Sequence, residues 1–234
     1  MRNLKYRSYE KELLDKDDIP FEDIRQNMRE LNTINTLLGG HKISIAGIRE
    51  ITGTTAHNET LSICEIGCGG GDNLKAISGW CVDKNIRANY TGIDIKASCI
   101  EYAAQQHPAL QATWIQSDYN KANLGSTKPG IIFSSLFCHH FMEDELISMM
   151  KWMTQNCSKG FFINDLQRSS MAYYLIKGIT RIFSASYLVK NDAPLSVARG
   201  FKRKEWENIL AAAGIFKYRI QWKWAFRYLI VCKK

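Results

Sequence analysis

The stretch that most constrains this chain is an apolar run that ends in a cluster of glycines, LSICEIGCGGGD, at residues 61–72. The run from Leu61 to Ile66 is β-prone, and the residues after Asp72 repeat apolar side chains at the spacing of a helix. A strand, a glycine turn and a helix in this order open the nucleotide-binding half of a doubly wound α/β domain. Glycine keeps the turn tight and lets a ligand touch the backbone, because no Cβ stands in the way.

The spacing of the glycines narrows the class of ligand. A dinucleotide fingerprint requires G-x-G-x-x-G or A, and Asp72 occupies its last position after Gly67 and Gly69. The pattern present is acid-x-Gly-x-Gly-x-Gly, from Glu65 to Gly71. It resembles the first motif of the class I S-adenosylmethionine-dependent methyltransferases of the small-molecule type. The resemblance extends from about residue 60 to the C-terminus.

This resemblance implies a fold and a division of the chain. The fold is α/β: a doubly wound, seven-stranded, mostly parallel sheet of order 3-2-1-4-5-7-6 with an N-terminal helical extension. Residues 1–58 would form an N-terminal helical cap, and residues 59–234 the S-adenosylmethionine-binding methyltransferase domain. The end of the chain agrees, because residues 216–224 alternate with period two and residues 227–232 are almost wholly apolar. These two segments predict a terminal hairpin with one edge strand and one interior strand.

Five further expectations concern segments outside the sheet. The leader, residues 1–18, looks mobile or loosely packed. Pro20 opens a helical pattern that ends at Gly39-Gly40, and a shorter helix is predicted over residues 43–51. Ser98 and Glu101 have the spacing of a capping box. The segment of about residues 184–200 lacks strong periodicity, and we interpret it as a substrate lid, with an inert long loop as the alternative.

Asp94 ends a predicted short strand, residues 91–95, where a carboxylate can accept hydrogen bonds from the hydroxyls of a ribose. The resemblance assigns that role to Asp94 and contact with the adenine amino group to Asp118. The alternative for Asp118 is a helix or turn cap. The resemblance implies S-adenosyl-L-methionine as the cofactor, and its full set of predicted cofactor-binding residues is Glu65, Gly67, Cys68, Gly69, Gly71, Asn73, Asp94, Ile95, Asp118, Tyr119 and Phe137.

Two adjacent histidines, His139 and His140, follow the predicted strand over residues 130–137. If the acceptor is a phenol or another hydroxyl, a general base assists methyl transfer, and histidine suits that role near neutral pH. We therefore name both as candidate catalytic residues, with Asp165 to orient a histidine or bind an acceptor hydroxyl. A structural role for the pair stays open, as does a helix cap for Asp165. The candidate substrate-binding residues are Arg168, Tyr173, Tyr187 and Arg199, of which the arginines are alternatively plain surface residues.

The resemblance favours a small-molecule acceptor, with O-methylation of a phenolic, quinone-like or polyketide compound as in bacterial polyketide and quinone pathways. The net charge of +8 keeps a rival open, namely an RNA or protein methyltransferase that uses the basic residues 201–234. Lysines on an edge strand also explain that charge, and the proline-containing motif of base amino methyltransferases is absent after residue 133. A non-catalytic S-adenosylmethionine-binding module is the second rival.

Composition bounds the remaining possibilities. The seven cysteines include no C-x-x-C pair, so we expect reduced thiols and no metal site. No apolar run approaches the ~20 residues that span a membrane, and we expect a cytoplasmic protein without a membrane span. A peripheral membrane contact through Trp222, Trp224 and Arg227 stays open, and the sequence does not fix the oligomeric state.

Calorimetry tests the predicted cofactor site. We expect S-adenosylmethionine and its demethylated product to bind at micromolar concentrations, and Asp94→Ala to abolish that binding because the ribose hydroxyls lose their acceptor. NAD serves as the control ligand. A preference for NAD would return the chain to an unassigned α/β domain.

Overall fold

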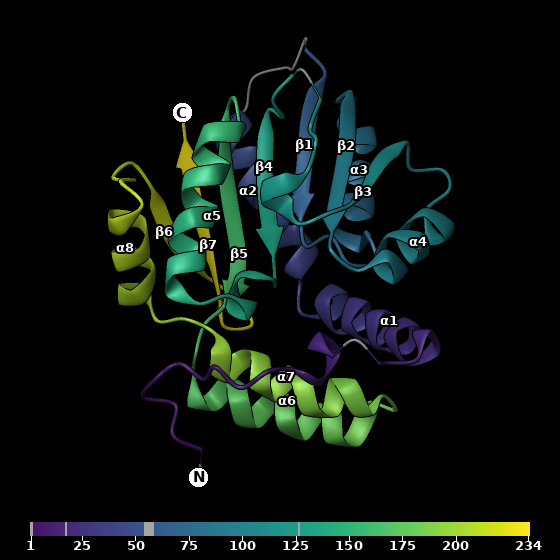
Figure 1. The fold of residues 1–234 in the computed structure, drawn as a ribbon, viewed down its shortest axis with the longest axis vertical. Coiled ribbons are helices and arrows are strands. Elements are labelled where there is room, and N and C mark those ends of the chain that lie inside the picture. The colour runs from purple at the N-terminus through teal and green to yellow at the C-terminus, as the bar shows by residue number, and fades with distance from the viewer. Residues whose placement is uncertain (1, 17, 54–58, 126) are drawn as a thin grey trace.

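The chain is built around one seven-stranded sheet in the order β3-β2-β1-β4-β5-β7-β6 (Figure 1), which confirms the predicted fold. A computed structural model describes residues 2–16, 18–53, 59–125 and 127–234. The first five strands in this order pair in parallel, and β7 is antiparallel to both β5 and β6. The predicted terminal hairpin is therefore present, with β7 inside the sheet and β6 at its edge.

The strands are β1 (Leu61–Ile66), β2 (Ala88–Asp94), β3 (Ala112–Gln116), β4 (Ile131–Ser135), β5 (Gly160–Leu166), β6 (Arg219–Lys223) and β7 (Arg227–Lys233). The α-helices are α1 (Phe21–Leu37), α2 (Gly40–Thr52), α3 (Asp72–Asp83), α4 (Ala97–Gln106), α5 (Glu143–Asn156), α6 (Ser170–Phe183), α7 (Tyr187–Arg199) and α8 (Arg203–Ala212). Short 3₁₀ turns are η1 (Leu13–Asp15), η2 (Tyr119–Lys121) and η3 (Cys138–His140).

Apolar side chains leave the sheet alternately on its two faces and build two cores. Along β4, Ile132 joins the core under α5 and α8, whereas Ile131 and Phe133 join the core under α2 and α3. This alternation follows from the period of two along a strand. The Trp206 side chain is fully buried on the first face, so both faces of the sheet are covered, as a largely parallel sheet requires.

Helices α1, α6 and α7 lie across the carboxyl ends of the parallel strands (Figure 1). Residues 187–199 form helix α7, so the alternative of an inert long loop is wrong there. Periodicity failed as a signal because this helix is enclosed on several sides: Asp192, Leu195 and Arg199 are all buried. A role for α7 as a lid stays a prediction.

The leader is not loosely packed where the structure describes it. Leu4 and Glu12 are buried, and the Ser8 N–H donates to the Ala198 carbonyl at 3.0 Å. Residues 1 and 17 lie outside the described residues, as do residues 54–58, which include the end of the predicted cap. The predicted helix over residues 43–51 begins earlier, at Gly40.

The predicted capping box at Ser98 and Glu101 is wrong. Helix α4 begins at Ala97, so Ser98 lies inside its first turn and Lys96 is the N-cap. The Lys96 N–H instead donates to the Asp94 Oδ1 at 3.0 Å, and the strand's own carboxylate supplies the acceptor at the start of the helix. Among the described residues, no helix is long and apolar enough to cross a membrane.

A matched pair of glycine substitutions tests the packing of α2 on the sheet. A Cβ at Gly47 would lie 2.6 Å from the Phe162 ring, whereas a Cβ at Gly79 in α3 would meet nothing within 4 Å. We expect Gly47→Ala to lower the free energy of unfolding by about 1–3 kcal/mol. We expect Gly79→Ala to raise it by up to about 1 kcal/mol, because alanine favours the helix. Urea unfolding measures both, and equal effects would contradict this packing.

Candidate functional site

A cavity of about 560 Å³ opens at the carboxyl ends of β1, β4 and β5, under the helices that cross them. This volume lies in the range of about 300–1,000 Å³ typical of ligand pockets. Most of the wall is apolar and comes from α1, α6 and the turn between β6 and β7, with Met28, Leu31, Leu175, Ile176 and Phe226 among its residues. The site lies where strand order reverses around β1 and β4, the usual binding position in an open α/β sheet.

The glycine turn after β1 forms one end of the cavity. Gly67 has φ +68°, and a Cβ there would lie 2.3 Å from the Phe137 ring, so only glycine fits. At Gly69, also in the left-handed region, a Cβ would meet no protein atom within 4 Å. The Gly69 N–H donates to the Asp94 Oδ2 at 2.9 Å, which fixes this carboxylate beside the turn. A ligand can therefore touch the backbone at Gly69 and the carboxylate of Asp94 together.

Glu65 is buried at the same end of the cavity and keeps one oxygen without a partner. Its Oε1 accepts from the Asn73 Nδ2 at 3.2 Å, while its Oε2 has no hydrogen bond among the described residues. Burial raises the pKa of this carboxyl well above its ordinary value. Asn73 is held in turn by His41, whose Nδ1 lies 3.0 Å from the Asn73 Oδ1. An unpartnered buried acceptor facing a cavity fits a ligand that carries N–H donors.

The predicted cofactor residues divide into two groups. The members that line the cavity are Glu65, Gly67, Cys68, Gly69, Asn73, Asp94, Ile95 and Phe137. Gly71, Asp118 and Tyr119 are not among its lining residues. A Cβ at Gly71 would lie 2.5 Å from the Trp114 ring, so this glycine serves packing. The Asp118 carboxylate accepts from the Asn120 N–H, which matches the cap that we considered as its alternative role. Its contact with an adenine stays a prediction.

The two histidines lie in η3, directly after β4, and both rings are oriented by carboxylates. The His139 Nδ1 lies 2.8 Å from the Asp165 Oδ1, and this pair is almost completely buried. The His140 Nδ1 lies 3.1 Å from the Asp15 Oδ1. Burial alone would raise the pKa of Asp165, but the interaction with His139 outweighs this effect and lowers the pKa. The Asp165 carboxylate therefore stays charged. The structure thus places Asp165 as the group that orients His139.

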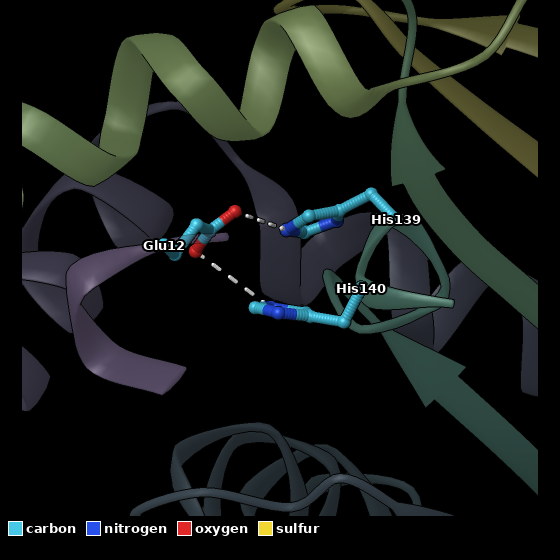
Figure 2. Close-up of side chains that lie close together, drawn as sticks. All are labelled: Glu12, His139 and His140. Carbon is cyan, nitrogen blue, oxygen red and sulfur yellow. Dashed lines mark ion pairs between the residues drawn. The ribbon is translucent and has the colours of Figure 1, made fainter. Parts of the chain in front are cut away.

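Glu12 faces both imidazole rings from the leader (Figure 2). Its Oε1 lies 3.6 Å from the His139 Nε2, and its Oε2 lies 3.8 Å from the His140 Nε2. Burial raises the pKa of Glu12 to about 7. Asp15 differs: despite partial burial, a hydrogen bond from His140 helps to lower its pKa to about 2. Glu12 is a functional candidate that the sequence did not indicate, because a lone glutamate in a polar leader carries no pattern.

The structure gives both predicted substrate-binding arginines structural partners instead. The Arg168 side chain is completely buried, pairs with Glu205 and donates to the Gly200 carbonyl at 2.6 Å. Arg199 donates from Nε and Nη2 to the carbonyls of His139 and His140 at 3.0 and 2.8 Å. Neither guanidinium lines the cavity. Arg199 therefore positions the two histidines, and Arg168 fastens the end of β5 to α8.

Neither predicted substrate-binding tyrosine lines the cavity among the described residues. Tyr173 is buried in a small core with Leu4 and Ala198. The Tyr187 hydroxyl donates to the Asp23 carboxylate at 3.2 Å on the outside of the molecule. Other residues of α6, such as Leu175 and Ile179, supply the wall of the cavity. Contact of either tyrosine with a substrate stays a prediction.

Three further polar residues line the cavity without protein partners for some of their buried atoms. Both amide atoms of Asn27, the Oδ1 of Asn35, and the Nε and Nη1 of Arg227 have no hydrogen bond among the described residues. Burial lowers the pKa of Arg227 to about 10, which leaves the guanidinium charged at neutral pH. Because Arg227 is 3% exposed, it is not available for the peripheral membrane contact that the sequence left open for Trp222, Trp224 and Arg227. A sequence pattern cannot reveal these residues, since their significance lies in the missing partners.

Comparison with known proteins agrees with this fold. A methyltransferase domain family matches residues 63–160, and no curated protein matches the chain. Among solved structures, the plantazolicin methyltransferase BpumL in complex with SAH is 17% identical, with a TM-score of 0.68 over 93% of this chain and 91% of that one. A SAM-dependent methyltransferase from Aquifex aeolicus is 16% identical, with a TM-score of 0.62 over 92% and 99%. Magnesium protoporphyrin IX methyltransferase from Synechocystis, with bound SAH, is 14% identical, with a TM-score of 0.54 over 94% and 90%.

A pair of arginine substitutions tests the reassignment of Arg168. We expect Arg168→Met to lower the free energy of unfolding by about 2 kcal/mol or more, because buried carbonyls lose their donor. Arg203→Met is the control, since Arg203 pairs with Glu207 at the surface; it should change stability by less than about 0.5 kcal/mol. Denaturant unfolding measures both. A stable Arg168→Met variant that has lost only ligand binding would restore the substrate role.

Proposed function

We propose that this chain is a class I S-adenosylmethionine-dependent methyltransferase and that it methylates an oxygen atom of a small acceptor, of the phenolic, quinone-like or polyketide kind. The observation that carries the proposal is the cavity that joins the glycine turn to the two histidines. Its volume and apolar walls suit a small, flat molecule better than a polymer. The acceptor thus enters between α1, α6 and the turn that joins β6 to β7.

The residues at the first end of the cavity fit the cofactor. The unpartnered Glu65 Oε2 accepts from an ammonium group, Asp94 accepts from ribose hydroxyls, and the open side of Gly69 admits the ligand to the backbone. When bound, the cofactor supplies a methyl group on a positively charged sulfur, which is already a good leaving group. The protein's task is then to align the acceptor and to exclude water.

The residues at the other end handle the acceptor oxygen and its proton. Asp165 binds the Nδ1–H of His139 and so leaves the Nε2 with its lone pair toward Glu12 and the cavity. A neutral imidazole in this orientation accepts the proton of an acceptor hydroxyl as the oxygen–carbon bond forms. His140 lies beside it, with ring centroids 4.5 Å apart, and faces the same space. Together they orient the oxygen toward the methyl group.

The position of Arg227 favours an acceptor that carries an acidic group. Its guanidinium is buried against the cavity with no ion pair to a described residue, although a buried charge without a partner is costly. A carboxylate or phenolate of the acceptor matches its planar N–H groups. Arg227 would then hold the end of the acceptor that is not methylated, the role that the sequence had suggested for Arg168 or Arg199.

The rival reading, a methyltransferase for RNA or protein, has less support. The basic residues of the C-terminal segment lie mainly outside the cavity. Lys233 pairs in register with Gly160 at the start of β5. This end of the strands is opposite the carboxyl ends, where the cavity opens. Arg203 and Lys204 lie on α8 beside Glu207. A polymer bound to these residues would be remote from the histidines.

An acceptor screen tests the proposal. We expect hydroxyaromatic acids to gain one methyl group by mass spectrometry and to exceed their methyl esters in kcat/KM by about tenfold or more, since a buried charged hydrogen bond contributes about 1.5–3 kcal/mol. Arg227→Met should remove that preference. Arg219→Met, on the exposed edge strand, is the control and should retain it. Equal rates for acids and esters would contradict the role of Arg227, and methylation of RNA instead would overturn the proposed function.

A further inference from the structure

The side chains of Glu12, His139 and His140 converge on one point beside the cavity (Figure 2). One ligating atom from each, a carboxylate oxygen and two imidazole nitrogens, lies within 4.8 Å of the others. We propose that these three residues bind a divalent transition-metal cation of the zinc class. Two imidazoles and one carboxylate are a set of ligands that zinc takes in catalytic sites, where it keeps an open position for a further ligand.

The separations between Glu12 and the imidazoles fit a cation better than direct hydrogen bonds. The two Nε2···Oε distances are 3.6 and 3.8 Å, which are longer than a hydrogen bond. Tetrahedral ligands at about 2.0–2.2 Å from a zinc ion lie roughly 3.4 Å apart. Small movements of the Glu12 side chain therefore bring all three atoms to ligating distance.

The outer nitrogens of both histidines are oriented as they are in metal centres. The Nδ1 of His139 is bound by Asp165 and that of His140 by Asp15, so each ring directs its Nε2 toward Glu12. A carboxylate behind a ligating histidine fixes the tautomer and increases the basicity of the ligand. Two such carboxylate–histidine pairs direct adjacent rings to one carboxylate. They indicate a metal site more strongly than the three ligand residues do alone.

The ligands are also held from behind by the surrounding elements. The Asp192 carboxylate accepts from the N–H groups of Leu13 and Leu14 at 2.8 and 2.9 Å and so holds the turn that follows Glu12. Ser196 donates to the Glu12 Oε1 at 2.8 Å. Arg7 and Arg199 bind the His139 carbonyl at 2.9 and 3.0 Å. This support limits the motion of the ligands before a cation binds.

The electrostatic balance permits a cation. Three carboxylates surround the histidines, from Glu12, Asp15 and Asp165. Three guanidiniums lie near them, those of Arg7, Arg199 and Arg227, but none of these forms an ion pair with Glu12, so its carboxylate is free to meet a cation. Because Glu12 and both histidines line the cavity, a fourth ligand can reach the cation from there.

That fourth ligand is the acceptor oxygen, a role that rests on the proposed function. A cation lowers the pKa of a coordinated hydroxyl, as it does that of bound water, and the proton is released to solvent. The metal-bound oxygen then forms the new bond to the methyl carbon, the carbon–sulfur bond breaks, and its electron pair stays on sulfur. The cation in this way replaces the proton that an imidazole would otherwise accept.

Cobalt(II) and zinc(II) titrations of the full chain, without cofactor or acceptor, test the site. We expect one Co²⁺ to bind with visible d–d absorption and no thiolate charge-transfer band, because none of the three ligands is a cysteine. Calorimetry with Zn²⁺ should show about tenfold or greater loss of affinity in both Glu12→Gln and His140→Asn. Asp165→Asn should weaken binding by about 10–100-fold, since it removes the support of a ligand.

His107→Gln is the matched control, because His107 does not line the cavity and should leave cation affinity unchanged. Circular dichroism confirms that each variant is folded, and His140→Asn retains the test if Glu12→Gln does not fold. No saturable binding by the unaltered chain, or equal affinity in all variants, would overturn the cation site. Tight binding without methylation of any hydroxyl acceptor would instead overturn the proposed function and leave the site standing.

Discussion

The hydrogen bond between Asp165 and His139 holds together the part of the molecule on which the cavity depends. Asp165 belongs to β5 and His139 to the turn after β4, so this 2.8 Å contact joins the carboxyl ends of neighbouring strands. Both groups are excluded from water, where an unmade hydrogen bond would be costly. With His139 fixed, its carbonyl becomes the acceptor to which Arg7 and Arg199 bind. The leader and α7 are therefore anchored to the same turn that carries the histidines.

This anchoring explains why the extension and the sheet domain act as one site. Asp192 and Ser196, on α7, bind the leader at residues 12–14. Arg199, one turn further along, binds the histidine backbone. The segment NDAPLSVARG thus connects Glu12 to the end of β4, and its buried Asp192 and Arg199 bond to backbone groups of the 3₁₀ turns η1 and η3. The sequence of this segment shows no helical pattern of apolar residues, because its side chains contact three different parts of the protein.

The sequence predicted those features whose residues lie close together along the chain. The hairpin and the glycine turn were predicted because period-two runs and a glycine cluster are local signals, whereas the strand order came from the family resemblance. Asp165 beside His139 was foreseen as one of three possibilities. Glu12 and Arg227 were not found as site residues, since they reach the cavity from segments 127 residues before and 88 after His139 in the printed sequence. Residue type did not indicate that Tyr173 and Tyr187 lie outside the cavity or that Arg168 and Arg199 bind backbone carbonyls, because it does not reveal which way a side chain faces.

The unpartnered polar groups at the two ends of the cavity differ in what they can bind. Glu65 at one end keeps a free acceptor, Arg227 at the other keeps free donors, and Asn27 and Asn35 along α1 keep both kinds. Each costs stability in the free protein, because a buried polar group gains nothing until it is bonded. A ligand pair that satisfies them recovers that cost on binding. The acceptor and cofactor thus complete a hydrogen-bond network whose protein half is already in place, and the apolar walls keep water from substituting for them.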